Sequence, residues 1–358
     1  MASLVAQPMT ASLVEEVTEL AEVPAPTFAE EERLAWLERR LEGAPGQRHR
    51  DAVGNLIWSW GSGRPRLVVA AHVDTVFPAG TDLTVRREGE DLVGPGIGDN
   101  AAAVAVAVQV TESLLREAGG DVAPGAVAFT VGEEGLGNLR GAREVVRTLD
   151  PEVLIALEGH LLDEIVVDAV GSVRARIVVS GPGGHSWQDR GLPGAIDGLL
   201  ELAAELRAYS APDAPVNLGT VAGGRSVNAI ADRAELLVER RALEQATLTE
   251  FESVLEALSL PEPLAVGVEV LGRRPAGRLD RTAPLLSAVL TVRARLGLEP
   301  RLAEGSTDAN AALAAGIPAL CIGCARGGSM HALDERIEAT TLALGAAQLD
   351  GVMREVLL

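Results

Sequence analysis

A histidine and an aspartate stand two positions apart at the end of a short apolar run. The run, residues 67–71, consists of Leu, Val and Ala, and His72-Val73-Asp74 follows it, a composition typical of a strand buried on both faces. Because residues two apart in an extended chain share a face, His72 can bind a metal through one ring nitrogen while Asp74 accepts a hydrogen bond from the other side of the ring. An isolated His-x-Asp is more often a buried structural histidine beside a turn, so this motif indicates a metal site only together with further ligands in the chain.

Carboxylates end two further apolar, strand-like runs. One run leads into Glu133 and Glu134, and the next leads into Glu158. Adjacent carboxylates at a strand end point in different directions, so one can bind a metal while its neighbour stays available as a base. By itself, a Glu-Glu pair is usually a solvated loop. Sites in open α/β sheets lie outside the carboxyl ends of the strands, and three such ends place His72, Glu134 and Glu158 at one edge of a sheet.

A glycine-rich stretch, residues 94–98, precedes Asp99 and a run of small residues that predicts a closely packed helix. The glycines are similar to a dinucleotide-binding fingerprint. However, Pro95 and Asp99 stand where a phosphate would need bare amides and no negative charge, which disfavours a nucleotide site. An aspartate at a loop-to-helix junction instead suits a carboxylate that is presented to a cation.

The composition narrows the class of protein. A chain of 358 residues predicts two domains, and a net charge of -20 argues against nucleic-acid and anionic-membrane partners. All 31 basic residues are arginines, which excludes lysine-dependent phosphate loops, Schiff-base enzymes and protein kinases. The amino terminus shows no secretory pattern, and residues 101–108 are too short to span a bilayer, so we expect a cytoplasmic protein. Cys321 and Cys324 lack a second cysteine pair, which favours two buried free thiols over a zinc knuckle or redox pair.

The order of the predicted elements indicates an inserted domain. Residues 11–42 predict two helices, the second capped by Thr27 with Glu30 three positions later. From residue 171 the pattern becomes β-α-β-β-α-β, the ferredoxin-like order. Its strands are expected at residues 172–180, 216–223, 234–241 and 265–271, and its helices at residues 192–209 and 248–258. We therefore predict an α/β fold in which a mostly parallel sheet flanked by helices (residues 1–170 and 276–358) carries an inserted α+β domain (residues 171–275).

Taken together, the motifs resemble the co-catalytic zinc metallopeptidases that include carboxypeptidase G, aminoacylase, acetylornithine deacetylase, succinyl-diaminopimelate desuccinylase and peptidase T. The resemblance covers nearly the whole chain, and its motifs stand in the family's order: His72-Val73-Asp74, residues 96–99, Gly132-Glu133-Glu134, Glu158, Gly183-Gly184-His185-Ser186, Asn228 and His331. One position departs from the family, because Ala101 stands where many members have a lysine two residues after the aspartate. This departure leaves the candidate ligands intact and weakens any assignment to a subfamily.

The resemblance implies a role for each of these residues. His72 and Glu158 would bind one zinc ion, Glu134 and His331 the other, and Asp99 would bridge the two. Glu133 would be the general base and Asp74 the partner of His72. The inserted domain would mediate a homodimer in which His185 reaches the partner's site, and Asn228 and Arg240 would contact the substrate. His160 is expected to be a bystander, and His49 to be solvated.

These residue types agree with a pair of Zn²⁺ ions, for which Co²⁺ or Mn²⁺ would be substitutes. The implied activity is hydrolysis of an amide bond in small peptides or N-acyl amino acids by a metal-bound hydroxide, with Glu133 as the base. Two alternatives remain open at this point. One is a non-catalytic binding or assembly module with the same fold, and the other is an oxidoreductase that uses the glycine-rich stretch or the cysteine pair.

Overall fold

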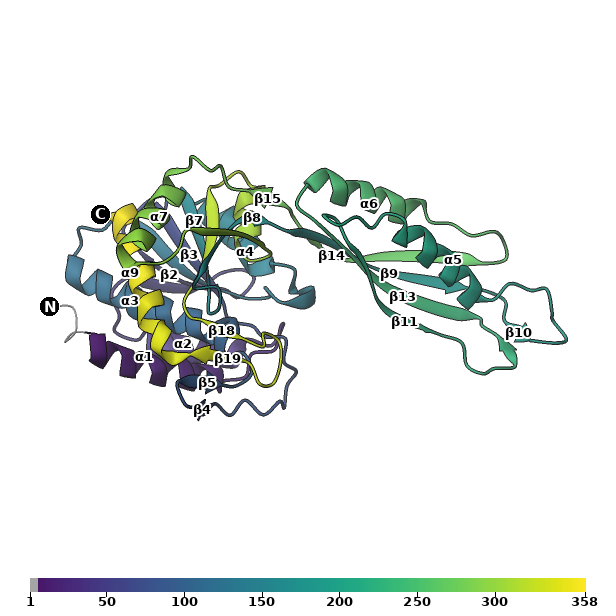
Figure 1. Ribbon diagram of the computed structural model, residues 1–358, viewed down its shortest axis with the longest axis horizontal. Coiled ribbons are helices and arrows are strands. Elements are labelled where there is room, and N and C mark those ends of the chain that lie inside the picture. The colour runs from purple at the N-terminus through teal and green to yellow at the C-terminus, as the bar shows by residue number, and fades with distance from the viewer. Residues whose placement is uncertain (1–5) are drawn as a thin grey trace. The chain divides into compact units, whose positions relative to one another are not determined.

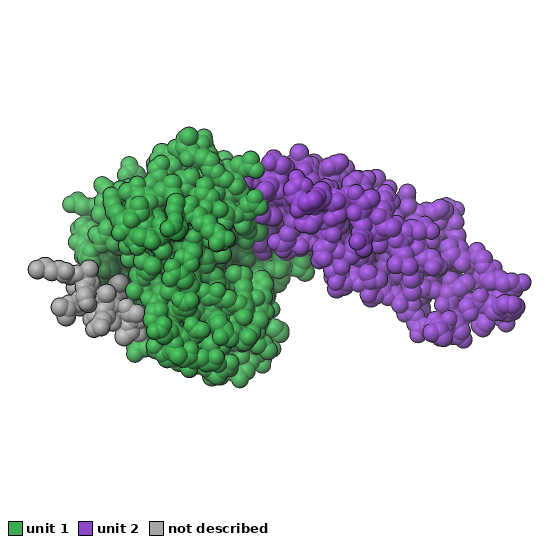
Figure 2. Space-filling model, viewed as in Figure 1, with its two compact units in different colours: residues 1–169, 278–358 green, residues 170–277 purple. Residues whose placement is uncertain are grey.

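The chain divides into two compact units, shown in the ribbon diagram of Figure 1 and in two colours in Figure 2. The computed structural model describes residues 6–358. Unit 1 comprises the described part of Met1–Ala169 together with Arg278–Leu358, and unit 2 is Val170–Gly277. Unit 1 is therefore built from two separate stretches of chain. Each unit has its own hydrophobic core, so each is described by itself.

A mostly parallel sheet forms the centre of unit 1. Its strands run in the order β1-β2-β6-β3-β7-β17-β8-β15, and β16 pairs with β8. The bounds are β1 (Gln47–Arg50), β2 (Leu56–Trp60), β3 (Leu67–His72), β6 (Gly125–Thr130), β7 (Val153–Glu158), β8 (Glu164–Ala169), β15 (Gly277–Arg278), β16 (Arg301–Gly305) and β17 (Ala319–Gly323). The central strands β6, β3, β7 and β17 are parallel to their neighbours within this group. The predicted mostly parallel sheet is confirmed.

Helices cover both faces of this sheet. The helices are α1 (Ala6–Ala21), α2 (Glu31–Arg40), α3 (Ala103–Ala118), α4 (Arg140–Leu149), α7 (Pro284–Leu296), α8 (Ala309–Ala314) and α9 (Leu342–Leu357). Alternate side chains of β3 enter different cores: Leu67 and Val69 pack with the layer that contains α3 and α9, and Val68 and Ala70 pack with α4 and α8. Because both faces of β3 are buried, its sequence is apolar up to His72, as expected from the sequence.

The strand ends and a small second sheet together position the candidate site. Because β3, β6 and β7 are parallel, their carboxyl ends lie at the same edge of the sheet. The second sheet has the order β18-β19-β5-β4, formed by β4 (Arg86–Glu88), β5 (Asp91–Val93), β18 (Gly327–Gly328) and β19 (Arg336–Glu338). Arg336 in β19 pairs with Val93 in β5, so the loop after β5 and the loop before β19 leave this sheet side by side. These two loops carry Asp99 and His331.

Unit 2 is a four-stranded antiparallel sheet with two helices packed on it. Its main elements are β9 (Gly171–Ser180), α5 (Ala195–Arg207), β11 (Val216–Gly223), β13 (Arg233–Ala242), α6 (Gln245–Ala257) and β14 (Ala265–Arg274), and the strand order is β11-β13-β9-β14. Alternate residues of β9, such as Val173 and Ile177, are buried with Leu199 of α5 and Phe251 of α6. A short ribbon, β10 (Gly184–His185) with β12 (Ala229–Ile230), extends from this sheet. The β-α-β-β-α-β order is the predicted one.

The predicted cap of the second helix is wrong. Helix α2 begins at Glu31, and neither Thr27 nor Glu30 makes a side-chain cap to it. Both side chains instead contact the loops of the candidate site, as described below. Short helical turns complete unit 1, namely η1 (Ile97–Ala102), η2 (Gly135–Gly137) and η3 (Ala339–Thr341). Within residues 6–358, none of the helices combines the length and the apolar character that a bilayer span requires.

Candidate metal centre

His72 ends β3 with its two ring nitrogens in different surroundings. Nδ1 lies 3.1 Å from the backbone carbonyl oxygen of Asp74 and 3.7 Å from its carboxylate oxygen Oδ1. Nε2 lies 3.0 Å from Asp99 Oδ1 and 3.5 Å from Glu158 Oε2. A proton on Nδ1 is therefore directed to the Asp74 carbonyl, and not to its carboxylate as the spacing suggested. This contact fixes the ring so that Nε2 faces the acidic groups.

The Asp74 carboxylate holds the turn that carries the two glutamates. Asp74 is fully buried. Its Oδ1 accepts a hydrogen bond from the Glu133 backbone N–H at 2.9 Å, and its Oδ2 accepts one from the Glu134 N–H at 2.9 Å. The Thr27 hydroxyl also donates to Oδ2, at 2.9 Å. Burial alone would raise the pKa of Asp74, but His72 and the backbone donors outweigh it and lower the pKa.

Asp99 lies between two histidines. One of its carboxylate oxygens is 3.0 Å from His72 Nε2, and the other is 3.0 Å from His331 Nε2. His331 Nε2 is also 3.3 Å from Glu134 Oε1. Two adjacent groups result: His72 and Glu158 on one side of Asp99, and His331 and Glu134 on the other.

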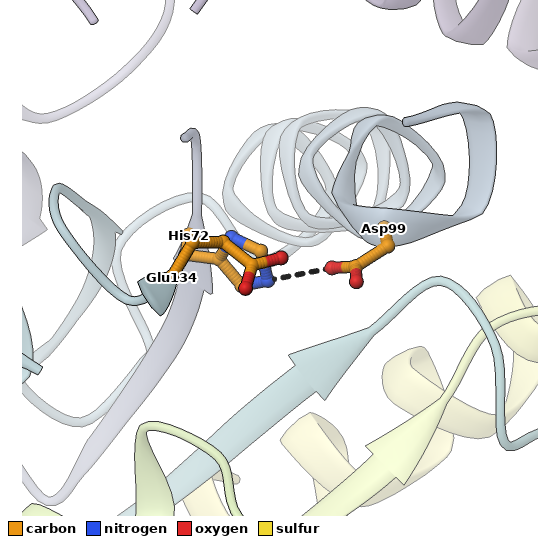
Figure 3. A group of neighbouring side chains, drawn as sticks. All are labelled: His72, Asp99 and Glu134. Atoms are coloured by element: carbon orange, nitrogen blue, oxygen red, sulfur yellow. Dashed lines mark ion pairs between the residues drawn. The ribbon is translucent and has the colours of Figure 1, made fainter. Parts of the chain in front are cut away.

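Ligand atoms of His72, Asp99 and Glu134 all lie within 4.8 Å of one another, which is close enough for a shared metal ion. Figure 3 shows these three side chains, with the dashed line marking the contact between His72 and Asp99. All three are buried. They come from the end of β3, the loop before α3 and the turn after β6, so the fold brings together residues that are separated in the sequence.

The acidic groups produce a strong negative potential at the histidines. Hydrogen bonds to Asp99 and Glu134 raise the pKa of His331 to about 10. Burial lowers the pKa of His72, but Glu158 and the other carboxylates outweigh it and raise the pKa well above its usual value. Burial raises the pKa of Glu158 to about 7, although His72 opposes this shift. A site of this kind attracts cations in competition with protons.

In unit 2, the structure places His185 beside Asn228. His185 pairs with Ala229 across the β10–β12 ribbon, and the Ser186 N–H donates to the Asn228 carbonyl at 3.1 Å. Nδ1 of His185 accepts hydrogen bonds from two backbone N–H groups, those of Trp187 at 3.1 Å and Gln188 at 3.3 Å. The remaining proton of a neutral ring is then on Nε2. His185 therefore presents a hydrogen-bond donor from an exposed loop.

Arg240 packs in the core of unit 2. It is 5% exposed on the helix-covered face of β13, and its guanidinium lies 5.5 Å from the centre of the Phe251 ring. Arg241 points to the other face of the strand, is exposed and pairs with Glu239 at 2.9 Å. The expected substrate contact of Arg240 stays a prediction.

Several residues near the site were not predicted from the sequence. Glu30 accepts hydrogen bonds from the Gly132 N–H and from Arg140. Asp308 accepts one from Thr130 at the end of β6, at 2.5 Å. Asp308 follows β16 by three residues, but β16 is largely exposed and carries charged residues, so the apolar run that identified Glu158 is missing there.

His160, expected to be a bystander, is buried and lies 2.9 Å from the carboxylate of Glu335. Glu335 itself was not singled out, and its one signal in the sequence is its place four residues after His331.

His49 and the two cysteines lie in the surroundings that were predicted for them. His49 is exposed, as expected for a solvated side chain. Cys321 and Cys324 are buried free thiols, and burial raises the pKa of each well above its usual value. Thiols of high pKa are poor nucleophiles at neutral pH, so this pair has no support as a redox centre.

Comparisons with known proteins agree with this geometry. Residues 68–355 match Peptidase family M20/M25/M40. A protein from Thermococcus kodakarensis, named as a LysW-lysine/LysW-ornithine hydrolase, is 27% identical over 348 residues, which cover 96% of this chain and 92% of that protein. A tripeptidase structure from Staphylococcus aureus superposes with a TM-score of 0.80 at 21% identity, covering 97% of this chain and 98% of that chain.

A second solved structure extends the likeness in fold. It is a dinuclear metal-binding M20 peptidase from Bacillus subtilis, with a TM-score of 0.69 at 17% identity, covering 97% of this chain and 98% of that chain. The family match includes every residue of the candidate metal centre. The chain therefore belongs to Peptidase family M20/M25/M40, a family of metal-dependent hydrolases, and the resemblance seen in its motifs is confirmed.

Proposed function

We propose that this protein hydrolyses an amide bond in small peptides or N-acyl amino acids with the help of two divalent metal ions per subunit. The observation that carries the proposal is the position of Asp99, whose two carboxylate oxygens each lie 3.0 Å from a different histidine. Each side of Asp99 adds a further carboxylate. The arrangement supports one metal ion held by His72, Glu158 and Asp99, and another held by His331, Glu134 and Asp99.

The donor set suits Zn²⁺, which prefers imidazole nitrogen and carboxylate oxygen ligands, and Co²⁺ or Mn²⁺ would be substitutes. The three carboxylates bring about three negative charges, which balance most of the charge of two dications. The raised pKa values of both histidines support the same conclusion, because they arise from the field that a metal ion would experience. Since neutral imidazoles ligate metals, binding would displace protons from both rings.

Bound metal ions would supply Lewis acidity, polarising the substrate carbonyl and lowering the pKa of water to about 7. Glu133 is placed to move the proton. It is buried, it directly precedes Glu134, and Asp74 fixes its backbone. We propose that the Glu133 carboxylate accepts a proton from the attacking water and delivers it to the leaving nitrogen. Asp74 would position both the His72 ring, through its carbonyl, and Glu133, through its carboxylate.

We propose that unit 2 forms a homodimer and supplies His185 to the partner's site. Strand β11 is an edge strand of its sheet. Val221 on β11 and Leu200 on α5 are 59% and 56% exposed, and exposed apolar groups of this kind support an interface. The Nε2–H of His185 would then stabilise the oxyanion of the tetrahedral intermediate, with the neighbouring Asn228 contacting the substrate.

The substrate class follows from the relatives' names. One relative is named as a tripeptidase, and another as a hydrolase of LysW-lysine and LysW-ornithine. Both names describe substrates that contain amino acids. We therefore propose exopeptidase or deacylase activity on small substrates of this type, including carboxypeptidase, aminopeptidase and deacetylase reactions. Hydrolysis assays with dipeptides, tripeptides and N-acyl amino acids on zinc-loaded protein would identify which of them it performs.

The variant Glu133→Gln tests the proposed mechanism. It should retain two metal ions and the fold yet lose about 10²–10⁴-fold in turnover, the range expected for a general base. The exposed Glu42→Gln is a matched control that should keep wild-type turnover. Near-wild-type turnover of Glu133→Gln with both metals bound would overturn the assignment of the base. Zinc-replete wild-type protein that binds fewer than two metals would overturn the two-metal site.

A further inference from the structure

Glu335 is a fully buried carboxylate outside the group of candidate ligands. It lies in the loop between β18 and β19, four residues after His331. Oε2 accepts a hydrogen bond from the Gly96 N–H at 2.9 Å. Oε1 accepts from the Gly98 N–H at 3.0 Å and from the Asp99 N–H at 2.7 Å. The backbone carbonyl of Glu335 also accepts from the Gly94 N–H at 2.9 Å.

These contacts hold a loop that lacks regular structure where it presents Asp99. Gly96 has φ of 71°, and Asp99 and Asn100 have non-helical backbone angles inside the turn before α3. Backbone N–H groups in such a loop have no helical or strand partner, and burying them without one costs about 1–3 kcal/mol each. Glu335 satisfies three of them with one side chain. The same three bonds determine where the Asp99 carboxylate lies relative to His331, because both loops are attached to Glu335.

His160 links this loop to a further ligand. It is buried, lies two residues after Glu158, and its Nε2 is 2.9 Å from Glu335 Oε1. The ring packs directly against Gly98, where a Cβ would overlap His160 Nε2. On its other side, a Cβ at Gly327 would lie 2.7 Å from His160 Nδ1. The pair of Glu335 and His160 thus connects the chain segments that carry Asp99, Glu158 and His331.

We propose that Glu335 is a positioning residue that, together with His160, sets the spacing of three candidate ligands and thereby the affinity of the site for metal. This inference rests on the proposed function, in which these ligands hold two metal ions. Groups that orient metal ligands typically contribute 10–100-fold to metal affinity. Glu335 acts on the loop backbones and has no contact with the His72 ring, so its effect is transmitted through Asp99 and His331.

The isosteric variant Glu335→Gln tests the proposal. Both carboxylate oxygens accept N–H donors, so an amide group must turn its NH₂ toward at least one donor in either orientation. We expect zinc affinity, measured by competition with a chromophoric chelator, to fall about 10–100-fold. The absorption spectrum of the Co²⁺-loaded variant should differ from that of the wild type, because the Asp99 and His331 ligands are displaced. A merely structural role of Glu335 would leave that spectrum unchanged.

Asp280→Asn is the control. Asp280 also accepts a backbone N–H bond, from Thr282 at 2.8 Å, and a second bond from the Thr282 hydroxyl at 2.8 Å. It is exposed in the turn before α7, and these bonds stay within that turn. Asp280→Asn should keep wild-type zinc affinity and Co²⁺ spectrum.

The result of these measurements distinguishes the positioning role of Glu335 from the proposed function. If Glu335→Gln binds two zinc ions with an affinity within about twofold of wild type, the proposal is overturned while the proposed function stands. If the wild type itself fails to bind two metals, the proposed function fails first. Should Glu335→Gln not fold, His160→Gln removes one of the four side-chain bonds to Glu335 and must lower zinc affinity by a smaller factor; unchanged affinity in that variant also overturns the proposal.

Discussion

Replacing Asp74 by asparagine would separate the task of its carboxylate, which holds the turn of Glu133 and Glu134, from that of its backbone carbonyl, which contacts the His72 ring. Asp74 is fully buried and accepts hydrogen bonds from the backbone N–H groups of Glu133 and Glu134 and from the Thr27 hydroxyl. Asparagine has the same shape but offers one acceptor oxygen and one NH₂ group. The substitution therefore keeps the packing, changes the hydrogen bonds and removes one buried negative charge.

The size of the effect follows from the partners of each oxygen. If the NH₂ group takes the place of Oδ2, the Thr27 hydroxyl can turn and accept from it, but the Glu134 N–H loses its partner. If it takes the place of Oδ1, the Glu133 N–H loses its partner. Either orientation leaves one buried backbone N–H unsatisfied, at a cost of about 1–3 kcal/mol. The displaced turn carries Glu133 and Glu134, so metal affinity should fall as well, by about 10–100-fold.

Urea unfolding of the metal-free protein would measure the first effect, and chelator competition the second. Thr27→Val is the control, because it removes one hydroxyl donor and leaves both backbone bonds to Asp74 intact. It should cost about 0.5–1.5 kcal/mol and have little effect on metal binding. An Asp74→Asn protein with wild-type stability and wild-type zinc affinity would refute the reasoning that this carboxylate holds the turn.

Other consequences can be tested with simple variants. His72→Ala should lose metal chiefly from one of the two positions, so elemental analysis should find close to one metal per subunit, and two retained ions would contradict the ligand assignment. Hydrogen bonds to Asp99 and Glu134 raise the pKa of His331 from 6.5 to about 10, so the folded metal-free protein binds this proton more tightly than the unfolded chain. Its stabilising contribution is complete below about pH 6.5 and is lost as the pH rises toward 10; urea midpoints should show this fall, and His331→Gln should reduce it. Mixing inactive Glu133→Gln with inactive His185→Ala should restore activity, because one site in each heterodimer has both wild-type residues. Independent proof of subunit exchange without recovered activity would place His185 within its own subunit's site or outside catalysis.

The parts of the site that lie at strand ends were predictable from the sequence. β3 and β7 are apolar because both of their faces are buried, and each ends in a polar residue at the edge of the sheet, His72 and Glu158. The contrast between an apolar run and the polar residue at its end is a local pattern, so it can be detected in a single sequence. His331 lies in a loop with no such contrast, and its assignment depended on the family resemblance.

The supporting contacts were not predictable in the same way. Thr27 and Glu30 match a helix-capping pattern, a local rule that tertiary contacts override here. The Thr27 hydroxyl bonds to Asp74, 47 positions away, and Glu30 bonds to the Gly132 N–H, 102 positions away. Glu335 bonds to backbone N–H groups, the nearest 236 positions away. Backbone donors are present at every non-proline residue, so no residue type in the sequence marks the partner of such a carboxylate.

The alternation along β13 predicts the direction of the Arg240 side chain. In β13, Ala234, Leu236 and Val238 alternate with more exposed residues and face the helices. Arg240 continues this series at a period of two, so the alternation itself predicts that its side chain points into the same core. The family resemblance predicts a role from the residue type, whereas the period of the strand predicts where the Arg240 side chain points.

The way in which unit 2 leaves and rejoins unit 1 has a consequence for how such enzymes diversify. β8 ends at Ala169, β15 is Gly277–Arg278, and the two strands are neighbours in the same sheet. Next to them, the Leu279 N–H donates to the Val167 carbonyl at 2.9 Å. The two points where the insertion begins and ends are therefore fastened to each other by the sheet itself. A segment exchanged there would leave the neighbours of the strands that bear His72, Glu134 and Glu158 in place, so the metal-binding edge of the sheet can be kept in evolution while the inserted unit changes.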